Sequence, residues 1–134
     1  MSKSDGNIRS RIDIIDTPDQ IMEKIKKSHT DMIDGISYDP DNRPGVSNLL
    51  DIQSSITGES ISNICEQCIS LNKVEFKTKL GEIIVEHLRP IRQEVERLLN
   101  DKGHLDNLLT EGNEKAAVIS ENTWKEVQKC IGFL

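Results

Sequence analysis

Apolar residues recur three and four positions apart through the second half of this chain, and turn-forming residues interrupt them near position 100. The first run keeps one face of residues 73–99 apolar, with Phe76, Leu80, Ile83, Ile84, His87, Leu88, Ile91, Val95, Leu98 and Leu99. This spacing predicts one long α-helix, for which Asn72 and Glu75 supply an N-terminal cap. Pro90 removes one helical hydrogen bond, but the apolar face stays in phase across it, so we expect a bend rather than a break.

A second apolar face follows the turn-forming residues 100–103, Asn-Asp-Lys-Gly. It comprises Leu105, Leu108, Leu109, Gly112, Ala116, Ile119, Thr123, Val127 and Cys130. Two amphipathic helices joined by a short turn pack as an antiparallel pair. We therefore predict a long kinked antiparallel helical hairpin as the frame of the molecule.

Three shorter helices are predicted in the first half. The first begins at Thr17, with proline at the next position and Gln20 completing a capping box, and it ends at residues 34–35, Asp-Gly. The second covers residues 46–57 and is closed by Gly58. The third starts after Ser60 and carries an apolar face of Ile61, Ile64, Cys65, Cys68 and Ile69. Helices of this length are unstable alone, so we expect them to pack against the hairpin.

Two segments lack helical periodicity. Residues 8–16 alternate between apolar and polar side chains, which predicts a short extended N-terminal arm. Residues 36–45 contain two prolines and several turn formers, so they form either a rigid corner or a recognition surface. The helical spacing that resumes at Val46 favours the corner. The predicted fold is all-α, a helical bundle built on the hairpin, with residues 1–16 as one domain and residues 17–134 as the other.

The net charge of −6 restricts how this chain could contact nucleic acid, because such proteins are usually basic. Residues 1–72 carry 7 basic and 12 acidic side chains, residues 73–102 carry 7 and 6, and residues 103–134 carry 3 and 5. Only the middle segment lacks an acidic excess, so any contact would use a local patch. No apolar run approaches the ~20 residues of a membrane span, and no membrane association is predicted.

Cys65 and Cys68 form a C-x-x-C, which is compatible with half of a zinc site or with a redox pair. The chain has no second C-x-x-C and no closely spaced histidine pair, and no predicted strand leads into this one. Both residues also fit the apolar face of a helix. We therefore favour two cysteines in the core and predict no metal site.

The first seven residues, Met-Ser-Lys-Ser-Asp-Gly-Asn, are the part of the chain in which side-chain chemistry points to a ligand. Lys3 lies between the hydroxyls of Ser2 and Ser4, and a strong turn signal follows. An ammonium group among hydroxyls and turn N–H groups suits phosphate oxygens, which makes an anionic ligand the natural partner. The alternative is an ordinary polar chain end.

Residues 1–4 followed by Asp5 resemble the KMSKS loop of class I aminoacyl-tRNA synthetases. Residues 30–31 (Thr-Asp), 38–40 (Tyr-Asp-Pro), 43–50 (Arg-Pro-Gly-Val-Ser-Asn-Leu-Leu) and 132–134 (Gly-Phe-Leu) are similar to the tryptophan-specific branch of bacterial and mitochondrial type. The resemblance implies the C-terminal portion of a tryptophan–tRNA ligase, beginning at the loop. It also implies that the helical bundle holds the tRNA anticodon.

Further expectations come from the resemblance alone. Lys3 would stabilise charge on the departing pyrophosphate, and Ser2 and Ser4 would support the loop and bind phosphate. The intact enzyme would use ATP with Mg²⁺, tryptophan and tRNA(Trp), and would be a homodimer. Its location would be the mitochondrial matrix, or the cytoplasm for a bacterial protein. The nucleotide-binding sheet and the tryptophan pocket have no counterpart in this sequence, so we expect the chain to be inactive alone.

Candidate tRNA contacts are Arg89, Arg92, Lys73 and Lys77 on the long helix, and Arg43 in the proline-rich loop. The alternative for the arginines is that Arg89, Arg92 and Arg97 form surface ion pairs with Glu86, Glu94 and Glu96. For the whole chain, the alternative function is a non-catalytic helical module that binds RNA or protein and retains a relic loop.

Overall fold

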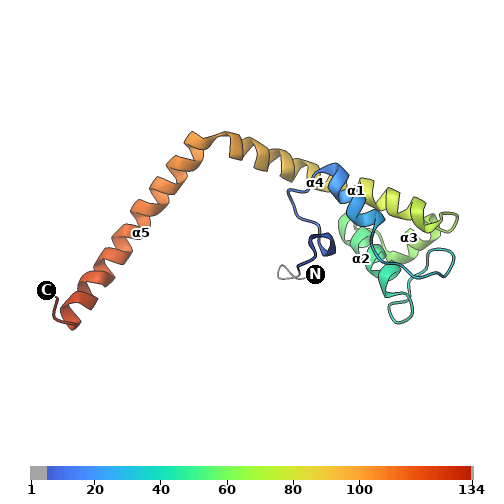
Figure 1. Ribbon diagram of the computed structural model, residues 1–134, viewed down its shortest axis with the longest axis horizontal. Helices are drawn as coiled ribbons and strands as arrows, with labels where there is room; N and C mark the ends of the chain where they lie inside the picture. The colour runs from blue at the N-terminus through green and yellow to red at the C-terminus, as the bar shows by residue number, and fades with distance from the viewer. Residues whose placement is uncertain (1–5, 134) are drawn as a thin grey trace. The chain divides into compact units, whose positions relative to one another are not determined.

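The computed structural model describes residues 6–133, so Ser2, Lys3 and Ser4 of the predicted phosphate loop lie outside the described residues. Every regular element in the described range is helical: η1 (Ile8–Ser10), α1 (Pro18–Lys26), α2 (Pro44–Thr57), α3 (Ile61–Gln67), α4 (Lys73–Asn100) and α5 (Lys102–Cys130) (Figure 1). The predicted all-α class is confirmed. The chain divides into one compact unit that ends at Arg92 and another that begins at Gln93. The predicted boundary after residue 16 stays a prediction.

The N-terminal end of α1 forms as predicted. Thr17 Oγ1 accepts from the Gln20 N–H at 3.3 Å, and Gln20 Oε1 accepts from the Thr17 N–H at 2.8 Å, which is a complete capping box. The predicted end at residue 35 is wrong, because α1 stops at Lys26. The backbone carbonyls of Ser28 and Asp31 accept hydrogen bonds from lysines of α4, and a continued helix would have used them internally.

The prediction of an extended arm over residues 8–16 is wrong for its first part, because residues 8–10 form a short 3₁₀ turn. Asn7 Oδ1 accepts from the Arg9 N–H at 3.1 Å, and the Ser10 N–H donates to the Asn7 carbonyl at 3.0 Å. A local side-chain bond of this kind competes with extended backbone. Arg11, at φ −141° and ψ 156°, keeps the expected extended conformation.

The next two helices follow the predicted signals closely. Gly58 closes α2 in the left-handed conformation at φ 74°, and Ser60 caps α3 by accepting from the Asn63 N–H. α3 ends at Gln67, and Ile69 beyond it is 81% exposed, so Ile69 does not extend the apolar face as predicted. α2 and α3 pack against each other.

The hydrophobic core belongs to the unit that ends at Arg92, and the first half of α4 supplies its largest side chain, Phe76. Phe76, Leu80 and Ile84 of α4 lie at or below 3% exposure. The three shorter helices and the loop between α1 and α2 contribute Ile21, Ile25, Ile36, Val46, Leu49, Leu50, Ile64 and Cys68. Each buried aliphatic or aromatic side chain stabilises the fold by roughly 1.5–3 kcal/mol, which is what short helices need in order to persist.

Two glycines allow close contacts in this core. A β-carbon on Gly45, in the first turn of α2, would lie 2.4 Å from the His29 carbonyl oxygen. A β-carbon on Gly81 of α4 would lie 2.5 Å from Met22 Sδ of α1. The second contact is at the far end of a flexible side chain, whereas the first is against backbone. Gly45 therefore restricts how the loop after α1 sits on α2.

α4 runs unbroken from Lys73 to Asn100 with Pro90 inside it, so the prediction of one helix rather than two is confirmed. Its start is capped as expected: Asn72 Oδ1 accepts from the Val74 and Glu75 N–H groups, and Glu75 Oε2 accepts from the Asn72 N–H at 2.9 Å.

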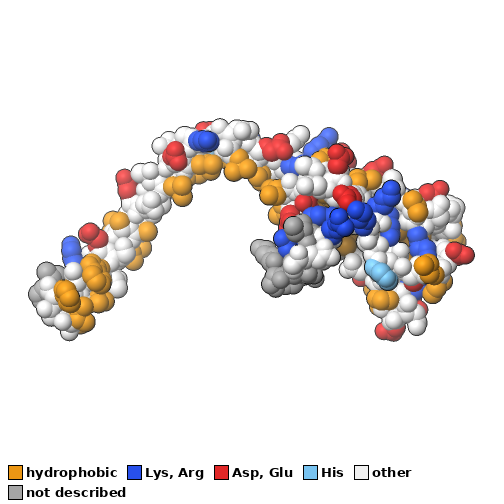
Figure 2. Space-filling view, in the orientation of Figure 1, with side chains coloured by type: hydrophobic (Ala, Val, Ile, Leu, Met, Phe, Trp, Pro, Cys, Tyr) orange, Lys and Arg blue, Asp and Glu red, His pale blue; other side chains and the backbone are white. Residues whose placement is uncertain are grey.

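The turn between the two long helices is shorter than predicted, and their antiparallel packing stays a prediction. Asp101 alone separates α4 from α5, fewer than the two to five residues of a helical hairpin loop. Its side chain accepts from the His104 N–H at 3.0 Å and so starts α5 within the expected turn. No residue of α5 is buried, and its apolar side chains are visible along the helix in Figure 2.

We predict that Gly45→Ala destabilises the chain, because the added methyl would collide with backbone rather than with a movable side chain. The free energy of unfolding in urea should fall by about 1–3 kcal/mol. Gly112→Ala is the control: no atom lies within 4 Å of its added β-carbon, and helical alanine is favoured over glycine by ~0.5–1 kcal/mol. A Gly45→Ala protein as stable as the parent would contradict the close approach.

Candidate nucleic-acid interface

The buried side chain of Arg43 holds the loop between α1 and α2 in place through hydrogen bonds. Its guanidinium donates in a bidentate manner to Asp31, from Nε at 3.0 Å and from Nη2 at 3.1 Å. The other bonds go to Ser37 Oγ at 2.6 Å, the Ile33 carbonyl at 2.9 Å and the Gly35 carbonyl at 3.0 Å. Arg43 is 3% exposed. Contact between Arg43 and tRNA stays a prediction. Within this chain, Arg43 holds the loop through its bonds to these four partners.

Asp31 is the carboxylate that forms the ion pair with Arg43. The hydrogen bond from Arg43 is the main reason that the pKa of Asp31 falls from 3.8 to about 2, and the bond from the Ile33 N–H adds to it. Lys73 contributes a weaker attraction, with its Nζ 3.8 Å from Asp31 Oδ1. An opposite charge and a donated hydrogen bond both favour the ionised carboxylate.

Lys73 and Lys77, one helical turn apart on α4, hold the same loop from the other side. Lys73 Nζ donates to the Asp31 carbonyl at 2.6 Å, and Lys77 Nζ donates to the Ser28 carbonyl at 2.7 Å. Burial and the neighbouring positive charge of Lys73 lower the pKa of Lys77. A carbonyl acceptor leaves each ammonium with its full charge and with unused donors, so tRNA contact by both lysines stays a prediction.

The two arginines that flank Pro90 have different surroundings. Arg89 is exposed and pairs with Glu86 at 3.0 Å, as Arg97 does with Glu94 at 2.7 Å. These are the surface ion pairs of the alternative interpretation, and solvent screens most of their attraction. Arg92 matches neither interpretation, because it is 9% exposed and donates to the Asp16 carbonyl at 3.1 Å. Arg92 is therefore a buried residue that holds the segment before α1, while its tRNA role stays a prediction.

Asp16 forms a second polar cluster that the sequence pattern did not reveal. Its Oδ2 accepts from Lys24 Nζ at 2.5 Å and from the Asp13 N–H at 2.8 Å, and its carbonyl accepts from Arg92. Asp16 is 7% exposed, and the side chain of Lys24 is almost as buried, at 9%. The cluster fastens the segment that follows the predicted phosphate loop to both α1 and α4.

The cysteines support the core interpretation of the C-x-x-C. Cys68 is fully buried in the hydrophobic core and Cys65 is partly buried, and burial raises the pKa of both thiols. Within residues 6–133, no three His, Cys, Asp or Glu side chains are grouped so that they could hold a metal ion. No helix in that range is long and apolar enough to cross a membrane.

Residues 1–89 match the family model described as "tRNA synthetases class I (W and Y)". The match covers well over half of the chain and includes α1, α2, α3, and Lys73 and Lys77 of α4. This chain therefore belongs to the class I tRNA synthetases of the W and Y family.

Relatives within the family are tryptophan–tRNA ligases of bacteria. The chain is 44% identical over 134 residues to the enzyme of Rickettsia typhi, and 42% identical over 133 residues to that of Listeria innocua. The two matches cover 100% and 99% of this chain but only 41% and 40% of the length of those enzymes. The crystal structure of tryptophanyl-tRNA synthetase from Mycoplasma pneumoniae superposes with a TM-score of 0.66 over 98% of this chain and 40% of that one, at 24% identity, which supports the fold. These relatives give no support to the expected mitochondrial location.

We predict that Asp31 makes acid stability depend on its bond to Arg43. Because its pKa is lowered from 3.8 to about 2, its stabilising contribution is complete above pH 4 and is lost as pH falls from about 4 towards 2. Asp31→Asn should remove this part of the acid transition, measured by circular dichroism at 222 nm. Arg43→Lys, which keeps the charge but not the planar fork, should shift the transition upward in pH. An Asp31→Asn protein with the parent's acid profile would contradict the assignment.

Proposed function

We propose that this chain forms the KMSKS-loop and tRNA-binding part of an enzyme that attaches tryptophan to tRNA(Trp). The observation that carries the proposal is the 44% identity to a tryptophan–tRNA ligase over all 134 residues. The match extends beyond the loop motif over the whole chain. Because the chain spans 41% of that relative, the complete reaction belongs to the proposal and not to this chain alone.

In the intact enzyme, ATP with Mg²⁺ would activate tryptophan, and the resulting acyl group would pass to tRNA. Ser2, Lys3 and Ser4 would hold the phosphates, with Lys3 meeting the charge that grows as pyrophosphate leaves. An ammonium flanked by hydroxyls suits that donor role. The described residues nearby supply mechanical support, because the cluster of Asp16, Lys24 and Arg92 fastens the following segment to α1 and α4. The homodimer is part of the same proposal.

The helical unit that ends at Arg92 would receive tRNA. Figure 2 shows Lys and Arg side chains gathered on one face of this unit, although the chain as a whole is acidic. An unpaired RNA loop is recognised by stacking and by contacts to base edges more than by a broad basic surface. A few lysine and arginine side chains placed beside the RNA loop are therefore sufficient for binding.

Filter binding of the purified chain to a tRNA(Trp) transcript tests this proposal. We expect binding that weakens as salt rises, and weaker binding to a tRNA of another specificity. Equal affinity for every tRNA would favour the non-catalytic RNA-binding module. No binding at low salt would remove tRNA as the partner of this chain.

A second prediction concerns catalysis. The chain alone should show no tryptophan-dependent exchange between ATP and pyrophosphate, because no strand or sheet is present in residues 6–133 to hold a nucleotide. In the full-length enzyme, Lys3→Ala should slow adenylate formation by roughly 10²–10³-fold with little change in tryptophan binding, because the charge it meets develops in the transition state. Exchange by the isolated chain, or an unchanged rate in the variant, would contradict these roles.

A further inference from the structure

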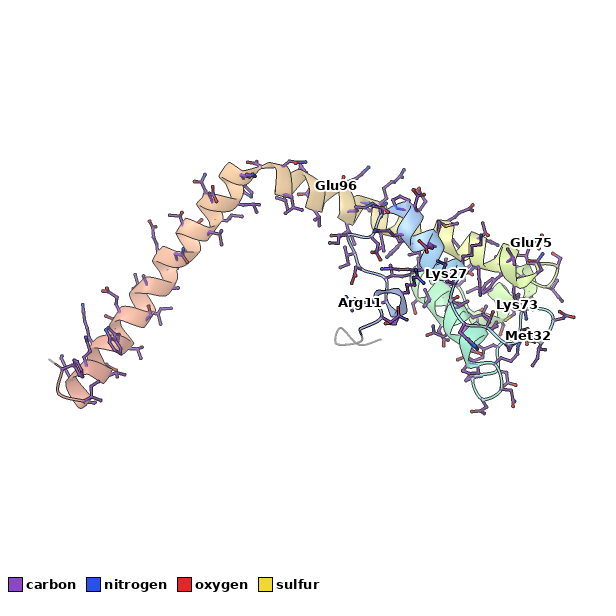
Figure 3. All side chains as sticks on the ribbon, in the orientation of Figure 1. Arg11, Lys27, Met32, Lys73, Glu75 and Glu96 are labelled. Atoms are coloured by element: carbon purple, nitrogen blue, oxygen red, sulfur yellow. The ribbon has the colours of Figure 1, made fainter. Side chains whose placement is uncertain are left out.

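A pocket of about 820 Å³ lies between α1, the loop that follows it and the first turns of α4. Its wall includes Met22 and Lys26 of α1, Met32 of the loop, and Lys73, Val74 and Lys77 of α4. Figure 3 labels Met32 and Lys73 beside each other at this end of the molecule. We call it the α1–α4 pocket. All of its walls belong to the unit that ends at Arg92.

The charges at the α1–α4 pocket do not balance. The main partners of its two carboxylates lie outside the pocket: Glu23 pairs with Lys27, and Asp31 pairs with Arg43 and only more weakly, at 3.8 Å, with Lys73 of the pocket. Three ammonium groups remain, from Lys26, Lys73 and Lys77. Lys73 and Lys77 donate chiefly to backbone carbonyls, which do not cancel their charge. In the described part of the chain, the exposed Lys26 has no hydrogen bond or ion pair.

An anion bound in the pocket would reduce the electrostatic repulsion between these lysines. Burial and the charge of Lys73 lower the pKa of Lys77, so both effects disfavour its charged form. An anion placed between them would reverse both effects and would accept from their unused donors. Phosphate is an anion that lysine binds as a point charge.

The apolar part of the wall sets a second requirement for the ligand. Met22 is half-buried, whereas Met32 is 96% exposed and Val74 is 66% exposed, so two apolar side chains face water at the pocket. Methionine makes favourable sulfur contacts with aromatic rings. A ligand that combines a phosphate with a flat aromatic ring would satisfy the lysines and the methionines together.

We propose that the α1–α4 pocket binds an unpaired nucleotide of RNA, with its phosphate on the three lysines and its base against Met22 and Met32. This inference rests on the proposed function and gives it a location. The volume falls within the range of natural ligand pockets and admits one or two nucleotides. The pocket is also held open in advance, because Arg43, Lys73 and Lys77 fasten its loop wall at Asp31 and Ser28.

The test uses two variants whose side chains support no contact in the described structure. Lys26→Gln removes one pocket charge, and Met32→Ala removes an exposed apolar surface. Each has a matched control outside the pocket: Lys129→Gln on α5 removes an exposed charge, and Ile69→Ala removes an apolar side chain that is 81% exposed. Lys73 and Lys77 are left intact because they also hold the loop.

Fluorescence anisotropy of the full chain with labelled RNA measures the effect. Lys26→Gln should weaken binding of a tRNA(Trp) transcript and lower the slope of log Kd against log salt by about 0.7, the value for one lost single-strand phosphate contact. Met32→Ala should weaken binding about two- to tenfold, the range of a sulfur–aromatic contact, with an unchanged salt slope. Both control variants should bind like the parent.

Separate RNA arms identify the source of the nucleotide. The anticodon stem-loop should compete with labelled tRNA(Trp), whereas a fully paired duplex of equal length and free nucleoside monophosphate should compete poorly. Competition by the monophosphate alone would assign the pocket to a free nucleotide and overturn the RNA proposal. If the parent binds tRNA(Trp) and both pocket variants match their controls, the pocket proposal is wrong while the proposed function stands. If the parent binds no tRNA, both proposals fail.

Discussion

The geometry of the helical unit depends on one buried guanidinium. Arg43 neutralises Asp31 and satisfies carbonyls at residues 33 and 35, so a loop with few apolar side chains of its own is held by hydrogen bonds. A buried arginine is tolerated only when its charge is paired and its donors are satisfied. Because the loop then keeps a single conformation, Gly45 can meet the His29 backbone, and the carbonyls of Ser28 and Asp31 can face α4.

The local signals of the sequence were sufficient for most helix ends. The capping box at Thr17, the left-handed Gly58 and the cap at Asn72 involve residues at most four positions apart, and each forms as predicted. The failures at the end of α1 and at Arg92 involve distant partners. α1 stops early because lysines 42 and 49 residues further along the chain bind the carbonyls beyond it. The burial of Arg92 could not be predicted from helical periodicity, because it depends on an acceptor that lies 76 residues away in the chain.

The candidate interface was predictable in residue type but not in arrangement. Lys73 and Lys77 were identified from the charge balance of residues 73–102, whereas Lys26, Met22 and Met32 were not, because they come from α1 and from a segment expected to be helical. Had residues 27–35 continued α1, Met32 would have followed the apolar face of that helix. The loop places it instead in solvent at the rim of a pocket.

A chain with net negative charge can still present positive charge to RNA if some of its cations pair with carboxylates while others bind carbonyl oxygens. Arg89 and Arg97 each pair with a glutamate three residues earlier, so their fields largely cancel at the surface. Lys73 and Lys77 bind mainly carbonyl oxygens, whose dipoles orient an ammonium without neutralising it. Lys27 and Arg43 take up the two carboxylates nearest the pocket, Glu23 and Asp31. The net charge of −6 therefore says little about the local potential, because these pairings leave the lysines of the α1–α4 pocket to determine its sign.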